Sequence, residues 1–428
     1  MTEVMPHAVY KERLVDKALD TYLSKLPAVL LVGPRASGKT TTASRCAASV
    51  VHLDRPAEAG LFRADPDAAL SRLPEPALLD EWQEVPEILG AVKRMVDDDP
   101  HAGRFVLTGS VGKQTQASTW PSTGRIVRLP VFPMAQREIV GSIGESFIDR
   151  LYAADLTAFT AGSQPCDIND YLGMAIRGGF PDAVLNRDEE GAELWLAGYV
   201  EELTHQDVRL VRRGIDPERF GAYAEAVASI TAGVVDVATI LDSVHIDRRT
   251  ADAYWRVMEN LYVADAVSAW WSSRLTRLVA LPKRYMVDAA LAVALLRLDT
   301  ESVVRDIDMV GRLLDTWVAQ QLRPEVALSR HRPRLHHLRT KGGEHEVDLV
   351  IEFGGGRVAA VEVKATASPG TDDARHLRWL RDALGDRFLI GVVLHTGPGD
   401  FVLSDRVVAA PMSTLWAGGC RSSVPPSP

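Results

Sequence analysis

Short apolar runs alternate with segments of helical periodicity over residues 10–130. Five of these runs are rich in Leu and Val and have the length of a buried strand. They span residues 26–32, 50–53, 76–80, 104–107 and 125–130. Helical spacing of apolar positions covers residues 10–24, 39–48 and 85–96. This alternation predicts an α/β domain with a doubly wound parallel sheet, whose ligand binds at the carboxyl ends of the strands.

Three helical segments followed by two strand-like pieces occupy the region 221–300. The helical segments span 220–231, 235–243 and 248–261, and the strand-like pieces span 263–271 and 283–287. This order is typical of a winged helix, whose last helix carries the contacts to DNA. Arg248, Arg249 and Arg256 on that helix are suited to phosphate contacts. Acidic residues lie between them, so a scaffold that binds no DNA is the alternative.

The pattern at the end of the chain predicts a second, smaller α/β domain over residues 301–416. An amphipathic helix (304–322) precedes an alternating hairpin, and a helix (374–384) and a buried strand (388–395) follow it. A helical connecting region is expected over residues 141–220. The Gly-, Ser- and Pro-rich end, 417–428, is predicted to be disordered. The expected domains are therefore 1–140, 141–220, 221–300 and 301–416.

The composition of the 428-residue chain limits the partners and the cellular compartment that can be expected for it. The formal net charge is −9, so any contact with nucleic acid has to come from a local basic patch. No apolar stretch reaches the length of a membrane span, and the N-terminus lacks an apolar signal core, which predicts no membrane partner. The three cysteines are scattered and form no C-x-x-C pair. This usage favours a reduced, cytoplasmic protein without disulfides or structural zinc.

The stretch after the first apolar run carries a specific chemistry. Residues 33–40 fit the pattern G-x-x-x-x-G-K-[ST] between a predicted strand and a predicted helix. In such a loop, backbone N–H groups surround phosphate oxygens, the lysine reaches the β- and γ-phosphates, and the hydroxyl that follows binds Mg²⁺. The predicted nucleotide-binding residues are Gly33, Pro34, Arg35, Ala36, Ser37, Gly38, Lys39, Thr40 and Thr41. We therefore predict that ATP and Mg²⁺ bind at this loop.

Two acidic residues end the third apolar run. Asp80 is predicted to hold Mg²⁺ through water, and Glu81 to polarise the water that attacks the γ-phosphate. The alternative is that both acids only cap the helix that follows them. A hydroxyl at the end of the fourth run, Thr108 or Ser110, is placed to sense the γ-phosphate or the attacking water.

The order and spacing of these motifs resemble those of a family of bacterial and archaeal AAA-type ATPases with a long, poorly characterised C-terminal region. The segments that carry the resemblance are GPRASGKTT, LLDEWQEVPEIL, VLTGS and GRIVRLPVFPMAQREI. The residues implied for the nucleotide machinery are Lys39, Thr40, Asp80 and Glu81, with Thr108 or Ser110 as the sensor. The resemblance also implies an arginine finger at Arg125, with Arg128 close by, and assembly into a homo-oligomer.

A second candidate site lies on the C-terminal hairpin. If Phe353 pairs with Arg357 across the glycine triplet 354–356, the register places Asp348 opposite Glu362. Lys364 is then on the same face, and the other face is apolar. Two facing carboxylates repel each other unless a cation lies between them, which predicts a divalent metal at Asp348 and Glu362.

This D…E-x-K pattern resembles the core of restriction-endonuclease-like nucleases. Asp315, on the preceding helix, stands where those nucleases usually have Glu. The resemblance implies metal-assisted cleavage of a phosphodiester, in which Lys364 orients or activates water. The alternatives are a solvated hairpin face, or a nuclease-like fold that only binds.

The function predicted from these features is Mg²⁺-dependent ATP hydrolysis by an AAA-type ATPase. The C-terminal half is expected to couple this activity to DNA or RNA, with help from the locally basic residues 323–341. Two alternatives are a nucleotide-switched regulatory protein that binds other proteins, and an ATP-dependent nuclease or toxin.

Overall fold

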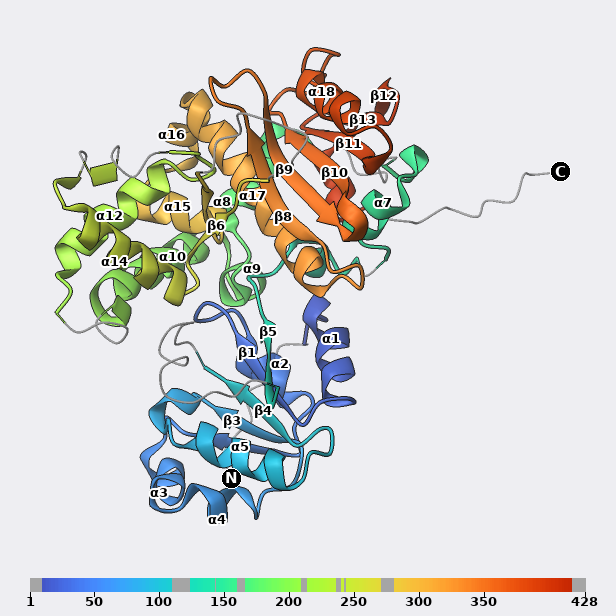
Figure 1. Cartoon of the computed structure of the whole chain (residues 1–428). Coiled ribbons are helices and arrows are strands. Elements are labelled where there is room, and N and C mark those ends of the chain that lie inside the picture. Colours follow the sequence, from blue (N-terminus) through green and yellow to red (C-terminus); the bar gives the residue numbers. More distant parts are fainter. Residues whose placement is uncertain are drawn as a thin grey trace.

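The computed structural model describes residues 10–109, 124–142, 144–159, 166–208, 214–235, 240–241, 244–270 and 281–417. Figure 1 shows a blue and cyan part with one sheet, a largely green and yellow helical part and a part with an orange and red sheet, which are called the N-terminal domain, the middle region and the C-terminal domain below. A parallel sheet comes first, helices follow, and a second sheet ends the chain. The predicted α/β fold class is therefore confirmed.

The N-terminal domain is built on a five-stranded parallel sheet. Its strands are β1 (Ala28–Val32), β2 (Ser49–His52), β3 (Ala77–Asp80), β4 (Phe105–Thr108) and β5 (Ile126–Pro130). They lie in the order β2-β3-β4-β1-β5, with every neighbouring pair parallel. All five predicted strands are confirmed. The loops that follow β1 and β3, which carry the predicted site, therefore leave the sheet at the same edge.

Helices cover both faces of this sheet. They are α1 (Leu14–Leu23), α2 (Lys39–Ser44), α3 (Pro56–Ala64), α4 (Pro66–Leu70) and α5 (Ile88–Asp98). Alternate strand residues face opposite ways, so Leu30 packs with α3–α5 and Leu31 with α1 and α2. The helix predicted over 85–96 begins later, after a 3₁₀ turn (Trp82–Glu84). Pro86 explains the delay, because the residue before a proline is disfavoured in helical conformation.

The middle region begins with short helices. They are α7 (Phe147–Ala153), the 3₁₀ turn η2 (Leu156–Phe159), α8 (Ile168–Arg177), α9 (Pro181–Asn186), α10 (Glu189–Glu202) and the π-helical η3 (Leu203–Asp207). They follow α6 (Gln136–Val140), the last helix of the N-terminal domain. Helix α7 ends before Ala154, whose left-handed φ of 56° separates it from η2. The turn at Gly178 and Gly179 separates α8 from α9.

In the second half of the middle region, the described helices and strands follow the predicted order, and most of the helix predicted over 235–243 lies outside the described residues. It contains α12 (Pro217–Ser229), α14 (Arg248–Asn260), β6 (Ala264–Val267), β7 (Lys283–Met286) and α15 (Ala289–Leu296). Asp247 caps α14 as expected, because its side chain accepts the Thr250 N–H. Strands β6 and β7 pair in antiparallel orientation, as a wing would.

The C-terminal domain contains a six-stranded mixed sheet. Its strands are β8 (Arg334–Arg339), β9 (Glu346–Phe353), β10 (Arg357–Val363), β11 (Phe388–His395), β12 (Phe401–Ser404) and β13 (Val407–Pro411), in the order β12-β13-β11-β10-β9-β8. Its helices are α16 (Thr300–Arg305), α17 (Ile307–Leu328) and α18 (Arg375–Leu384). The helix predicted over 304–322 is divided at Asp306, which ends α16 and caps α17.

The β9–β10 hairpin has the predicted register but not the predicted faces. Arg357 pairs with Phe353, and Val361 with Leu349. One apolar face was expected, yet Val361 and Leu349 pack on the α17 side while Val358 and Val350 pack under α18. Glu346, Asp348 and Glu362 lie toward the end of the hairpin away from its loop, whereas Glu352 and Arg357 lie beside the loop. The alternation of polar and apolar residues therefore predicted the strand pairing, but it did not predict that apolar residues pack on both faces of the hairpin.

The N-terminal domain is joined to the C-terminal domain through α6. The Gln136 N–H donates to Gln321 Oε1 on α17 over 2.5 Å. Arg137 forms a buried ion pair with Glu325, also on α17, and Glu325 accepts the Ile148 N–H. Burial raises the pKa of Glu325 and the Arg137 guanidinium opposes that rise. Removal of either partner of a buried ion pair destabilises the fold, because the remaining charge is then buried without compensation.

We expect Glu325→Ala to lower the free energy of unfolding by about 3–5 kcal/mol, since it leaves the Arg137 guanidinium buried without its carboxylate. Denaturant unfolding of the purified chain measures this loss. The control is Glu301→Ala, which breaks an exposed ion pair with Arg305 and should cost no more than about 1 kcal/mol. Equal losses in the two variants would contradict a structural role for the buried pair.

Candidate functional site

The predicted phosphate loop runs from the end of β1 to the start of α2. Gly33 approaches the backbone so closely that a Cβ there would lie 2.0 Å from the Val131 carbonyl oxygen. Gly38 has a φ of 90° and forms the N-cap of α2. A side chain is unfavourable at both positions, which is why the loop needs glycine there. The loop therefore brings backbone N–H groups and the start of a helix to one point.

Lys39 lies folded under this loop. Its Nζ donates to the carbonyl oxygens of Gly33 (3.1 Å) and Pro34 (2.6 Å). Burial lowers the pKa of Lys39 to about 8, while the Glu81 carboxylate acts in the opposite direction. The ammonium is therefore held with neutral partners in a position where an anion would stabilise its charge.

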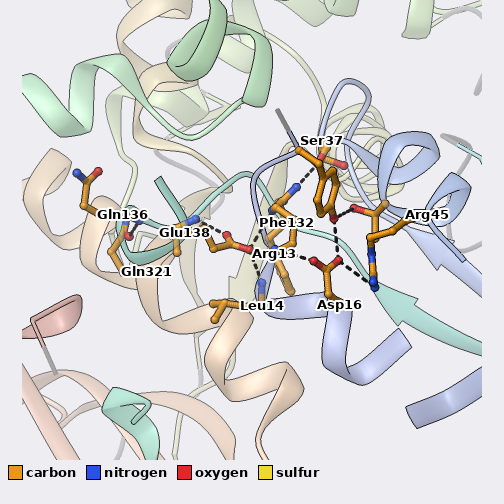
Figure 2. A network of polar contacts seen from close by, with 12 residues as sticks. Arg13, Leu14, Asp16, Ser37, Arg45, Phe132, Gln136, Glu138 and Gln321 are labelled. Carbon is orange, nitrogen blue, oxygen red and sulfur yellow. Dashed lines mark hydrogen bonds and ion pairs between the residues drawn. The ribbon is translucent and has the colours of Figure 1, made fainter. Parts of the chain in front are cut away.

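A buried network that the sequence did not suggest holds the loop in place (Figure 2). Arg13, the residue before α1, donates to the carbonyl oxygens of Ser37 (3.0 Å) and Phe132 (2.8 Å) and to Glu138 Oε1 (2.9 Å). Glu138 also accepts the N–H groups of Leu14 and of Ala135, each over 2.7 Å. The segment PMAQREI thus fixes the loop to α1 and, through α6, to α17.

Asp80 and its neighbours form the second part of this site. The hydroxyls of Thr40 and Thr108 donate to Asp80 Oδ1 over 2.7 Å and 2.5 Å. His52 Nδ1 lies 3.2 Å from Asp80 Oδ2. The structure therefore brings Thr40 and Asp80 together, as predicted for Mg²⁺ binding, and places Thr108 against Asp80. His52 was not predicted, because a lone histidine at a strand end has no distinguishing pattern.

Glu81 lies next to Asp80 in an uncommon backbone conformation. Its φ is 53°, in the left-handed region, and its carboxylate accepts a hydrogen bond from Gln83. Strain of this kind at a non-glycine residue is frequent at functional sites. Burial and the neighbouring Asp80 charge raise the pKa of Glu81, against a hydrogen bond from Gln83 and the attraction of Lys39. The change is in the direction that a general base at neutral pH requires.

Several other predicted residues lie away from this centre. Ser110 is outside the described residues. Arg35 forms an ion pair with Asp207 of η3, and Thr41 is exposed. Arg125 lies before β5, where its Nε is 2.7 Å from Asp97 at the end of α5. That is the amino end of the sheet, roughly five residues or about 17 Å of strand away from the loop after β1.

The residues of the loop fit a nucleotide with Mg²⁺. The Ser37 side chain is fully buried, and its hydroxyl has no hydrogen-bond partner in the described part of the chain. The buried Lys39 ammonium has neutral oxygens as its only hydrogen-bond partners there. The Thr40 hydroxyl and Asp80 carboxylate are oxygen groups of the kind that binds Mg²⁺, which usually keeps several waters and uses substrate phosphates as ligands.

The second candidate site is brought together at the end of the β9–β10 hairpin, beside α17. An open cleft of about 670 Å³ is lined there by Asp315, Asp348, Glu362 and Lys364, among others. Lys364 Nζ lies 3.4 Å from Glu362 Oε2. Asp348 Oδ2 accepts the Val363 N–H over 3.0 Å. All four residues predicted from the hairpin and from α17 therefore line one cleft.

The structure adds Lys283, at the start of β7, as a partner of two acidic residues of this cleft. Its Nζ lies 2.5 Å from Asp315 Oδ2 and 3.0 Å from Asp348 Oδ1. The Tyr285 hydroxyl donates to the other oxygen of Asp315 over 3.0 Å. Lys283 is buried, and no pattern in the sequence predicts this placement. The middle region thus contributes a cation to a site otherwise built from the C-terminal domain.

The charges of this cluster depend on one another. Burial raises the pKa of Asp315 to about 6 against the attraction of Lys283. Burial also acts to raise the pKa of Asp348, but the Lys283 ammonium and the Val363 N–H hold it below its usual value. Burial and the Asp348 charge raise the pKa of Glu362. Among the described residues no group of three or more His, Cys, Asp or Glu side chains is arranged to hold a metal ion.

Comparison with known families identifies the class of the N-terminal domain. Residues 25–140 match a family described as an AAA domain. Together with the parallel sheet and the loop geometry, this match supports an AAA-type P-loop ATPase. Residues 168–302 and 310–415 match two families described only as domains of unknown function, DUF8612 and DUF4143. Neither match bears out the winged-helix or nuclease-like descriptions, which stay predictions.

The similar proteins include uncharacterised proteins of Mycobacterium tuberculosis and Mycobacterium bovis. Each is 26% identical over 402 residues, which cover 93% of this chain and 82% of the relative. A solved structure of a Walker-type ATPase of Pyrococcus abyssi is 15% identical and covers 66% of this chain and 94% of that one, with a TM-score of 0.41. In the described part of the chain, no helix has the length and apolar character needed to cross a membrane.

Proposed function

We propose that this protein hydrolyses ATP with Mg²⁺ at the loop 33–40. The observation that carries the proposal is the convergence of Lys39, Thr40, Asp80 and Glu81 at the carboxyl ends of β1 and β3. In this proposal Lys39 binds the β- and γ-phosphates, Thr40 and Asp80 hold the metal, and Glu81 takes a proton from the attacking water. The bound Mg²⁺ would neutralise charge on the phosphates.

We further propose that nucleotide binding is coupled to the rest of the chain. Two contacts of the loop support this coupling. Arg35, inside the loop, pairs with Asp207 of η3, and Tyr199 of α10 donates to the Arg35 carbonyl oxygen over 3.4 Å. Arg13 links Ser37 to Glu138 of α6. Gln136 of the same helix donates to Gln321 of α17. A phosphate bound at the loop would compete with Asp207 for the Arg35 guanidinium.

Nucleic acid is the partner that we propose for the C-terminal half. Arg248, Arg249 and Arg256 are exposed on α14, and exposed arginines on one helix suit phosphate contacts. The locally basic stretch gives less support than expected, because Arg323 is buried in α17 with its guanidinium 5.0 Å from the Tyr285 ring centre. The regulatory alternative, with a protein as partner, predicts an ATPase rate that does not respond to DNA or RNA.

Reversing two charges on α14 tests this proposal. We expect Arg248→Glu with Arg249→Glu to weaken DNA binding, to flatten its salt dependence by about one to two units of slope, and to remove DNA stimulation of ATP turnover. Fluorescence anisotropy at several salt concentrations and phosphate release measure these effects. The control carries the same charge change on the exposed Arg55 and Arg63 of the N-terminal domain. Equal affinity of the α14 variant and the wild type would make this region a scaffold.

Assembly into a homo-oligomer is a further proposal, since Arg125 is too far from the loop of its own copy. An arginine finger acting on a neighbour contributes about 10³-fold or more to the rate. We expect Arg125→Ala and Lys39→Ala to be inactive separately and to regain part of the activity when mixed. Phosphate release and sedimentation with and without ATP test this expectation. A monomer with full activity in every nucleotide state would contradict it.

A further inference from the structure

Two acidic residues that line the cleft between α17 and the β9–β10 hairpin already share a cation supplied by the chain. Lys283 Nζ contacts Asp315 and Asp348, at 2.5 Å and 3.0 Å, so a single ammonium bridges two carboxylates from different elements. Its side chain is 2% exposed, so water contributes little to its solvation. Buried charges persist in proteins when they are paired and hydrogen-bonded, and both conditions hold for Lys283.

Several contacts outside the charge cluster fix the position of Lys283. It starts β7 and pairs with Val267 on β6. Two residues before it, the Leu281 carbonyl oxygen lies 2.9 Å from His337 Nε2 on β8, and two residues after it the Tyr285 hydroxyl donates to Asp315. The β6–β7 hairpin is thus held against both the sheet and α17. The ammonium is a fixed part of the site.

A divalent metal does not fit beside this ammonium. Mg²⁺ binds oxygen ligands at about 2.0–2.1 Å and requires near-octahedral geometry. An ion that ligated both Asp315 and Asp348 would occupy the space between their oxygens, where Lys283 Nζ already lies. The two positive charges would repel each other strongly at that separation in a buried site.

We infer that Lys283 takes the place that a divalent metal would have between Asp315 and Asp348, so that the wild-type chain binds no metal at this pair and cleaves no phosphodiester there. The buried Glu362 Oε1, which lacks a hydrogen-bond partner among the described residues, completes a set of acidic oxygens that becomes available when the ammonium is removed. Lys283→Met, which keeps the apolar stem but has no atom at the position of Nζ, therefore creates a divalent-metal site. This inference concerns a site separate from the nucleotide loop.

Calorimetric titration with MnCl₂ of the nucleotide-free full chain tests the inference. Four proteins are compared: the wild type, Lys283→Met, Lys283→Met with Asp348→Asn, and Lys341→Met, which removes an exposed lysine of the same domain. We expect Lys283→Met to gain one Mn²⁺ site that the added Asp348→Asn change removes. The affinity for Mn²⁺ should differ at least tenfold between the single and the double variant. The wild type and Lys341→Met should show no such site. Any weak binding at the nucleotide loop is common to all four and cancels.

Thermal unfolding gives a second readout that does not depend on activity. The melting temperature of Lys283→Met should rise on addition of MnCl₂ and fall with a chelator, while that of the wild type should not respond. If Lys283→Met does not fold in chelator, the wild type is compared with Asp348→Asn by Mn²⁺ electron paramagnetic resonance. Equal binding by those two proteins supports the inference. Binding that Asp348→Asn removes from the wild type overturns it, as does a folded Lys283→Met without a metal site.

Discussion

Glu81→Gln is expected to bind ATP with near wild-type affinity and to hydrolyse it about 10²- to 10⁴-fold more slowly. Glutamine keeps the shape of the side chain and its ability to accept a hydrogen bond from Gln83, but it cannot take a proton from water. Lys39, Thr40 and Asp80 remain in place, so the contacts proposed for the phosphates and the metal are unchanged. Binding and hydrolysis should therefore separate in this variant.

Equilibrium binding of a fluorescent ATP analogue and single-turnover phosphate release measure the two properties independently. The matched control is Glu84→Gln, since Glu84 is exposed three residues further along the chain. It should keep both properties. Wild-type turnover by Glu81→Gln would exclude Glu81 as the base and would favour the simpler role of an acid in the first turn after β3.

Lys39→Ala is expected to lose ATP binding by at least about 10²-fold and to lose measurable turnover with it. Two charge-assisted hydrogen bonds to phosphate oxygens are removed, at about 1.5–3 kcal/mol each, and every 1.4 kcal/mol is tenfold in affinity. The free protein should tolerate the change, because Lys39 is buried with only carbonyl partners and has a lowered pKa. Isothermal titration with ATP and Mg²⁺ measures the loss.

Lys25→Ala provides the control for this variant, because Lys25 is an exposed lysine beyond the end of α1. Its affinity for ATP should equal that of the wild type. A folded Lys39→Ala protein that bound ATP as tightly as Lys25→Ala would show that nucleotide binds elsewhere on the chain.

The parts of the structure that the sequence predicted well depend on short-range patterns. The loop 33–40 and the pair Asp80 and Glu81 are contiguous motifs at the ends of apolar strands, so their spacing already defines their geometry. The register that aligns Asp348 with Glu362 follows from the glycine triplet, because a hairpin is a local structure. In each of these cases, residues close together in the sequence are sufficient to predict the local geometry.

The parts that the sequence did not predict depend on contacts between distant segments. Arg13 and Glu138 are 125 residues apart, and Lys283 and Asp348 are 65 residues apart. A single arginine before a helix, or a single lysine at the start of a strand, looks the same in the sequence whether it is solvated or buried. Only the packing of the middle region against the C-terminal sheet shows that Lys283 belongs to the acidic cleft.

The central claim, that the loop 33–40 is the site of ATP hydrolysis, is tested most directly by steady-state phosphate release from ATP in Mg²⁺. We expect turnover by the wild type that disappears in chelator, that is retained by Lys25→Ala, and that is absent in both Lys39→Ala and Glu81→Gln. Turnover by Lys39→Ala at the wild-type rate, with the protein pure and folded, would contradict it.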